Sequence, residues 1–161
     1  MWEMRRSGAA SEVNAFEPNY EGSPIVWGPA EANCSATGAH SFTARPGHHL
    51  APVALSGGSN LYDELGKGFT LVALDADAAA VKAFATLARA LSVPLTVIED
   101  RRTGERARYE ATLLLVRPDQ FVAWTSDNGE FDPEVILKRV TGLGAKTARP
   151  LETQDGPVAG R

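Results

Sequence analysis

The sequence is poor in the residues that most often carry redox or metal chemistry. Cys34 is the single cysteine among 161 residues, and only three histidines are present. One cysteine excludes an internal disulfide, a CxxC pair and a cysteine-based zinc site. A chain without disulfides is typical of a reducing compartment, so we expect a cytoplasmic protein.

Long apolar runs and an excess of basic charge are also missing. No apolar stretch approaches the roughly 20 residues that a membrane-spanning helix needs. The residues that follow Arg5 and Arg6 are small and polar, unlike the apolar centre of a signal peptide. The formal net charge is −4, and an acidic chain repels phosphate backbones. We therefore expect neither a membrane nor a nucleic acid as partner.

Small, polar and turn-forming residues are concentrated at both ends of the chain. In residues 1–45 only Pro24–Trp27 has the composition of a short extended piece, so we predict an irregular N-terminal arm there. Residues 145–161 have a similar composition and predict a flexible tail. Residues 46–144 remain as one folded domain, whose length is ordinary for a domain.

Apolar runs and helix signals alternate within residues 46–144. The run at 49–55 predicts a strand, which Pro52 restricts to a sheet edge or a strand start. A turn at 56–60 and one helical turn at 61–65 follow. The apolar runs at 69–74 and 95–98 predict buried central strands. Between them, the Asp75-Ala76-Asp77 segment favours a helix start, so a parallel βαβ unit is expected.

The second half of the domain predicts a hairpin and a final helix. Apolar runs at 111–116 and 121–124 flank an Arg-Pro-Asp-Gln turn at 117–120. Pro133 opens the last helix and Gly142 ends it. This order of elements predicts an α/β fold of the thioredoxin-like class in the peroxiredoxin-type order. One mixed sheet with helices on both faces is expected.

The position at which such a fold carries its redox nucleophile contains no nucleophile here. In redox members a cysteine follows the central strand, where the start of the long helix stabilises a thiolate. This chain has Asp75 and Asp77 instead. Aspartate at that place is ordinary capping chemistry, and its charge disfavours a thiolate nearby. We therefore assign no catalytic residue.

Two other groups of polar residues are candidate binding sites. His48 and His49 are adjacent, so on an extended chain they point to opposite faces, and no acidic residue lies within ten positions of His48. Arginines 101, 102, 106 and 108 could hold a phosphate, but neighbouring carboxylates offset their charge. We expect a surface or interface role for the histidines, with His40 nearby, and a solvated loop for the arginines.

No metal-binding or cofactor-binding residue is assigned, because no GxGxxG or P-loop pattern is present. Most aromatic residues are explained by core packing. Trp27, in the predicted arm, is the exception, and we expect it to contact another surface.

Several stretches resemble the C-terminal domain of class A FAD-dependent aromatic monooxygenases, which include phenol, chlorophenol and polyketide hydroxylases. Together they cover residues 20–142, and their order and spacing agree with that family. They are YEGSPIV at 20–26, RPG at 45–47, LYDELG at 61–66, GFTL at 68–71, LLVRPD at 114–119 and VAW at 122–124. The chain departs from the family at His49, Ala51, Pro52 and Thr125.

The resemblance implies a domain without catalysis of its own. In the family, FAD and substrate are held by domains whose dinucleotide motifs are missing here, so no cofactor is expected in this chain. The implied role is dimerisation, or packing against a flavoprotein hydroxylase. Two alternatives remain open: a stand-alone thioredoxin-like redox protein that uses Cys34, and a small-ligand binding module with a pocket near Asp75–Asp77.

Overall fold

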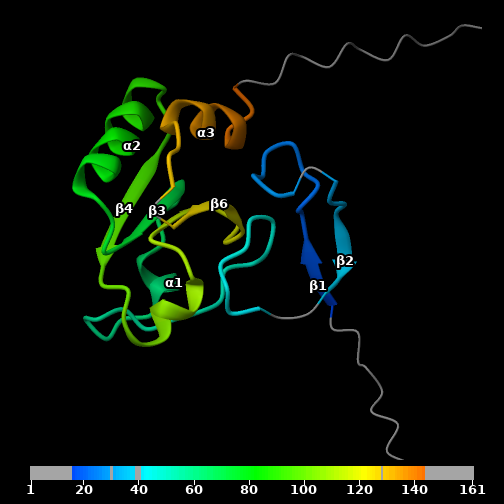
Figure 1. Cartoon of the computed structure of the whole chain (residues 1–161), viewed down its shortest axis with the longest axis horizontal. Helices are drawn as coiled ribbons and strands as arrows, with labels where there is room; N and C mark the ends of the chain where they lie inside the picture. Colours follow the sequence, from blue (N-terminus) through cyan, green and yellow to red (C-terminus); the bar gives the residue numbers. More distant parts are fainter. Residues whose placement is uncertain (1–15, 30, 39–40, 128, 144–161) are drawn as a thin grey trace, which may run out of the picture.

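A four-stranded mixed sheet forms the centre of the structure (Figure 1). The computed structural model describes residues 16–29, 31–38, 41–127 and 129–143. The sheet has the order β4-β3-β5-β6, in which β3 and β4 are parallel and the other neighbours are antiparallel. Its strands are β3 (Phe69–Leu74), β4 (Leu95–Asp100), β5 (Leu113–Val116) and β6 (Val122–Ser126). The predicted parallel unit and the predicted hairpin are both confirmed.

Helices cover both faces of this sheet. The helix α2 (Ala78–Ala90) connects β3 to β4, and α3 (Pro133–Val140) follows β6. Both pack on one face, whereas α1 (Leu61–Glu64) and the 3₁₀ helix η1 (Gly104–Tyr109) pack on the other. The prediction of a mixed sheet with helices on both faces is confirmed.

The alternation of side chains along β3 divides the core into two clusters. Leu71 and Ala73 face α2 and α3, where Phe84 is fully buried. Val72 and Leu74 face the opposite side, where Leu61 and Tyr109 complete a second cluster. Because both faces of β3 are covered, its sequence is almost continuously apolar.

The predicted strand at 49–55 is wrong. This segment makes only isolated bridges, from His49 to Phe121 and from Ala54 to Asn60. Its backbone bonds go to different parts of the chain, since Leu50 N donates to the Gln120 carbonyl and the Val53 carbonyl accepts from Leu61 N. The run is apolar because it covers the α1 face of the sheet: Leu50, Ala51 and Val53 are buried there.

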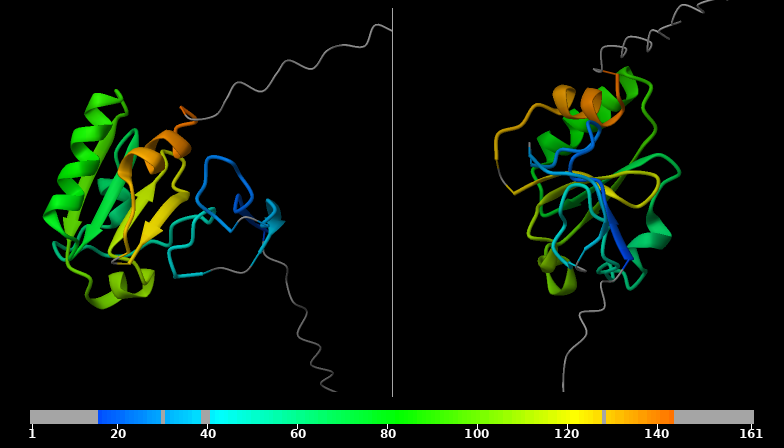
Figure 2. Two further views of the ribbon diagram at one scale, coloured as in Figure 1. Left: turned by 45° about the horizontal axis from the view of Figure 1, so that its top comes forward. Right: turned by 90° about the vertical axis from the view of Figure 1, so that its right-hand side faces the viewer.

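The N-terminal segment lies beside β6 (Figure 2). Two short strands, β1 (Phe16–Asn19) and β2 (Ser35–Thr37), pair antiparallel within a stretch that we expected to be irregular. Pro24–Val26 forms turns and a bend instead of an extended piece, and Val26 is fully buried.

The division into arm, domain and tail at residues 45 and 144 stays a prediction. The predicted tail, residues 145–161, lies outside the described residues. Within the part of the chain that the structure describes, no helix has the length and apolar character to cross a membrane.

Candidate functional site

The junction between β3 and α2 uses both of its aspartates to hold backbone groups. Asp77 is the N-cap of α2 and accepts a hydrogen bond from Ala79 N at 3.2 Å. Asp75 has a φ of 52°, and its carboxylate accepts from Arg102 N at 2.8 Å. Capping by Asp77 was predicted, whereas the bond from Asp75 to the connection after β4 was not. Both carboxylates are therefore committed to backbone donors.

A cavity of about 460 Å³ opens beside this helix start. Its lining is mixed, with Asp77 and Glu130 as acidic groups and Phe131 as the largest apolar group. Two carboxylates disfavour an anion, although helix N-termini generally attract anions. The cavity can accept a small neutral or cationic molecule.

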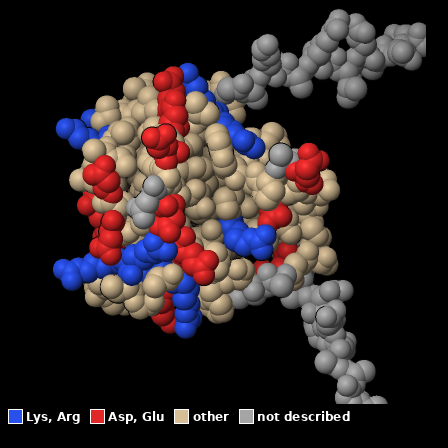
Figure 3. All heavy atoms as spheres, in the orientation of Figure 1, with Lys and Arg blue, Asp and Glu red and all other residues tan. Residues whose placement is uncertain are grey.

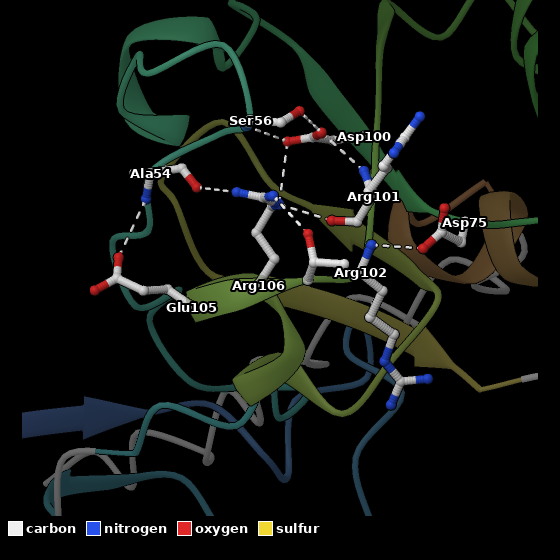
Figure 4. Close-up of polar contacts among 9 residues, drawn as sticks. Ala54, Ser56, Asp75, Asp100, Arg101, Arg102, Glu105 and Arg106 are labelled. Carbon is white, nitrogen blue, oxygen red and sulfur yellow. Dashed lines mark hydrogen bonds and ion pairs between the residues drawn. The ribbon is translucent and has the colours of Figure 1, made fainter.

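The charged connection after β4 contains a buried arginine (Figure 4). Arg106 donates from Nε to the Arg101 carbonyl at 2.7 Å and from Nη1 to the Ala54 carbonyl. Its Nε also lies 3.2 Å from Asp100 Oδ2. The expectation of a solvated loop is therefore wrong for Arg106, because its guanidinium joins segments distant in sequence. The fork of donors on arginine suits such a role.

The carboxylate of Asp100 is held in its charged form by its surroundings. Burial alone raises the pKa of Asp100, but hydrogen bonds from Ser56 and from Arg101 N, together with the Arg106 guanidinium, bring this pKa below its ordinary value. At the end of the same 3₁₀ helix as Arg106, the Tyr109 hydroxyl donates to the Ala51 carbonyl, and burial raises the pKa of Tyr109. The group is a structural network, and its polar atoms are directed at one another.

The four arginines of this connection do not converge on one site. Arg102 pairs with Asp127 at 2.5 Å, and Arg108 lies 5.2 Å from the centre of the Phe42 ring. Arg106 is used inside the network described above. Figure 3 shows acidic and basic side chains intermixed on the face drawn, so no continuous basic surface forms there. The arrangement does not build a phosphate site.

The adjacent histidines have separate partners. His48 Nε2 lies 2.8 Å from Glu21 Oε1, and the Arg45 guanidinium donates to the same oxygen at 3.0 Å. The His49 ring packs against Tyr62 and Phe121. His40 lies outside the described residues. Among the described residues, no group of three or more His, Cys, Asp or Glu side chains is placed to hold a metal.

Trp27 contributes to a groove between the N-terminal segment and α3, whose lining is aromatic and aliphatic apart from Glu130 and Asp132. The Arg139 guanidinium lies 4.6 Å from the centre of the Trp27 ring, and Trp27 N donates to the Ala123 carbonyl. The groove has a volume of about 300 Å³ and includes Val135, which is 51% exposed. Trp27, which we expected to contact another surface, therefore packs against α3 and β6 of its own chain. Cys34 is exposed and directly precedes β2.

Residues 43–144 match the family described as aromatic-ring hydroxylase, C-terminal. The chain belongs to this family. The match covers the complete four-stranded sheet, all three helices and the buried Arg106 network. The sequence resemblance to flavin-dependent hydroxylases is therefore confirmed.

Proteins similar to this member of the aromatic-ring hydroxylase C-terminal family are flavoenzymes. The chain is 37% identical over 109 residues to the FAD-dependent monooxygenase apdD of Emericella nidulans. That match covers 63% of this chain and 17% of apdD. The chain thus spans about a sixth of that relative.

Solved structures agree with this family membership. RebC with bound 7-carboxy-K252c superposes with a TM-score of 0.63 at 31% identity, covering 74% of this chain and 23% of RebC. A ternary complex of aklavinone-11 hydroxylase with FAD and aklavinone superposes with a TM-score of 0.60 at 27% identity, covering 73% of this chain and 25% of the hydroxylase. In each case the matching region is about a quarter of a longer flavoprotein.

Sequence reasoning missed two long-range groups in this C-terminal domain. Glu21 lies 27 positions before His48, so a search of ten neighbouring residues could not find it. Arg106 lies in a charged stretch that reads as surface loop. The single available signal was Tyr109, a large aromatic residue three positions further along, which indicates that this stretch contacts the core.

Proposed function

We propose that this chain is a non-catalytic domain of an FAD-dependent aromatic hydroxylase and that it acts through protein contacts. The observation that carries the proposal is the junction after β3. Where a redox protein of this fold places its nucleophile, Asp75 and Asp77 bond to Arg102 N and Ala79 N. Each carboxylate has the role expected of a capping or backbone-bonding group, and a carboxylate there opposes a thiolate.

We also propose the thioredoxin-like fold for this domain. The order β4-β3-β5-β6 supports it, as do the parallel pair joined by α2 and the antiparallel hairpin followed by α3. Apart from the strand expected at 49–55, which does not form, the elements from α1 to α3 follow the predicted order. The coarser description, a mixed α/β domain of the aromatic-ring hydroxylase family, does not depend on this assignment.

The proposed partner is either a flavoprotein hydroxylase or a second copy of this chain. The similar proteins carry the matching region as about a sixth to a quarter of their length. FAD would then be held by the partner's own domains. The half-exposed Trp27 and the exposed Val135, at the groove beside α3, support a role in packing.

A titration with FAD tests the non-catalytic part of this proposal. The absorbance spectrum of the purified chain is recorded first, and flavin fluorescence is then followed as FAD is added. We expect no bound flavin and no saturable change in fluorescence. A yellow protein, or stoichiometric binding, would show that the chain has a flavin site of its own and would contradict the proposal.

The cavity beside α2 supports a second candidate, a small-ligand binding module. Its size suits a small organic molecule, and Asp77 with Glu130 favours a cationic one. Thermal shift measurements with a panel of organic amines test this candidate, with the Glu130→Gln variant as control. A shift in melting temperature that is lost in Glu130→Gln supports ligand binding, and its absence in the intact chain rejects it.

Redox activity of Cys34 is tested by the Cys34→Ser variant. Under the proposed function, both forms show no peroxide or disulfide turnover. Turnover that depends on Cys34 would instead favour the stand-alone redox protein.

A further inference from the structure

The two edges of the sheet differ in what covers them. The outer edge of β6 is bonded to the N-terminal segment, since Trp27 N donates to the Ala123 carbonyl and Gly47 N to the Val122 carbonyl. The edge at the opposite end is β4, and no further strand follows it in the described part of the chain. Figure 2 shows the N-terminal segment beside β6, at the far end of the sheet from β4.

The backbone direction of β4 identifies the groups that face outward. The Pro94 carbonyl accepts from Phe69 N and the Asp100 carbonyl accepts from Asp75 N, so both face β3. In a strand, the N–H and C=O of one residue point to the same edge, and successive residues alternate. The backbone N–H and C=O groups of Thr96 and Ile98 therefore also point toward β3. The outward groups belong to Leu95, Val97 and Glu99.

Several of the features that prevent strand pairing are absent from this edge, and Glu99 is its one exposed charged residue. The strand contains no proline, no lysine and no bulge, and its register with β3 is regular over all six residues. Glu99 is exposed and the other β4 residues are half-buried, whereas the last five residues of β3 are buried. A regular edge with unpaired donors and acceptors is suited to pairing with another strand.

We propose that β4 pairs antiparallel with β4 of a second copy of this chain, so that the two sheets become continuous. The inference rests on the proposed role in protein contacts and assigns it to one surface. A two-fold axis between the two Val97 residues makes the edge self-complementary. Val97 then exchanges both backbone bonds with Val97 of the second copy, and Leu95 does so with Glu99 of the second copy.

The charges at the two ends of β4 favour this antiparallel arrangement. The acidic end carries Glu99, and the opposite end lies beside exposed Lys67. Lys67 is held there because its neighbours Gly66 and Gly68 pack closely on Thr96 and Pro94; a Cβ at Gly68 would lie 2.5 Å from the Pro94 oxygen. The proposed pairing brings Lys67 of one copy toward Glu99 of the other and keeps like charges apart.

A cavity at the acidic end of β4 can take side chains of the second copy. This cavity of about 300 Å³ lies between the turn at 55–59 and residues 97–100 of β4. The turn is anchored by Ser56, whose N donates to Asp100 Oδ2 at 2.8 Å. The turn therefore lies beside the acidic end of β4. In the proposed antiparallel pairing, the Leu95 end of the second copy lies at this end, and its side chains can enter the cavity.

The experiment compares two substitutions at one outward-facing position. Glu99→Pro removes the outward N–H and places a ring at the edge, whereas Glu99→Ala keeps the backbone donor. Both leave the bonds to β3 intact, because the Glu99 backbone faces away from β3. Sedimentation equilibrium on the 161-residue chain measures the dimer dissociation constant. Far-UV circular dichroism and melting temperature verify that each variant is folded.

We expect the intact chain and Glu99→Ala to be dimeric, and Glu99→Pro to dissociate at least about tenfold more readily because backbone bonds are lost in both copies. Lys67→Glu and Glu99→Lys should each weaken the dimer, and the double variant should restore it. A monomeric intact chain overturns the proposal, as does a dimer that Glu99→Pro leaves unchanged. Either result leaves the FAD titration, which tests the proposed function, unaffected.

Discussion

Arg106 and Asp100 form an ion pair in the interior, beneath the loop at residues 54–56. Nε of Arg106 lies 3.2 Å from Oδ2 of Asp100, and the two side chains are 9% and 6% exposed. The same guanidinium reaches the carbonyl oxygens of Ala54 and Arg101, so one side chain joins the loop, the end of β4 and η1. Removing one partner of such a pair leaves a buried charge without compensation.

Replacing Arg106 is expected to be strongly destabilising. Arg106→Met keeps the aliphatic stem but removes the oppositely charged partner of Asp100 and the donor to the Ala54 and Arg101 carbonyls. We therefore expect a loss of about 3–5 kcal/mol in the free energy of unfolding. Arg108→Met is the matched control, since that guanidinium lies over the Phe42 ring and its loss should cost less than about 1 kcal/mol. Urea denaturation measures both, and equal losses would contradict a structural role specific to Arg106.

Asp100 should make stability depend on pH in the acidic range. Because the pKa of Asp100 in the folded state lies below its ordinary value, its charged form stabilises the fold above the unfolded pKa, near 3.9. This contribution is lost as the pH falls through the folded pKa. The intact chain should therefore be more stable than Asp100→Asn at pH 7, and the difference in melting temperature should shrink as the pH is lowered below about 4. A difference that is constant with pH would refute this assignment.

The cluster between α2, β6 and α3 depends on Phe84. This side chain is fully buried, with ring centres of Trp124 and Phe131 at 5.4 and 5.7 Å. Phe84→Ala should lower the free energy of unfolding by about 3–5 kcal/mol, because a cavity remains in the core. Val135→Ala, at an exposed position of α3, should change it by no more than about 0.5 kcal/mol. Chemical denaturation of both variants provides the comparison.

Glu21 should hold the N-terminal segment to the sheet. Its carboxylate contacts both His48 and Arg45, and the side chains of Glu21 and His48 are 19% and 16% exposed. Glu21→Ala is expected to speed amide hydrogen exchange in residues 20–27 while lowering global stability by about 1 kcal/mol or less. Glu31→Ala, at an exposed position of the same segment, is the control. Unchanged exchange in Glu21→Ala would show that other contacts suffice.

The N-cap of α2 offers a test of the capping role assigned to Asp77. Asp77→Ala removes the acceptor for Ala79 N and should cost about 1 kcal/mol of stability. Asp77→Asn keeps an acceptor oxygen and should cost clearly less. If both variants unfolded at the same denaturant concentration as the intact chain, the hydrogen bond from Ala79 N would contribute nothing to stability.

The local elements of this protein follow from its sequence. The runs that became β3 and β4, the helix that begins after Asp77, and the hairpin around Pro118 are recognised from neighbouring residues alone. Each depends on interactions over a few positions: side-chain alternation, a capping oxygen or a fixed proline φ. The family resemblance rests on the same local motifs, and residues 43–144 confirm it.

The tertiary structure decided what those motifs could not. The apolar run at 49–55 covers the sheet instead of joining it, because Pro52 has no donor and its neighbours bond to two different segments. Arg106 can be buried because the tertiary structure brings Asp100 and the Ala54 carbonyl within bonding distance of its guanidinium. His48 meets Glu21 across 27 positions. These contacts depend on how the chain returns on itself, which local periodicity does not encode, and burial then determines which charges must be paired.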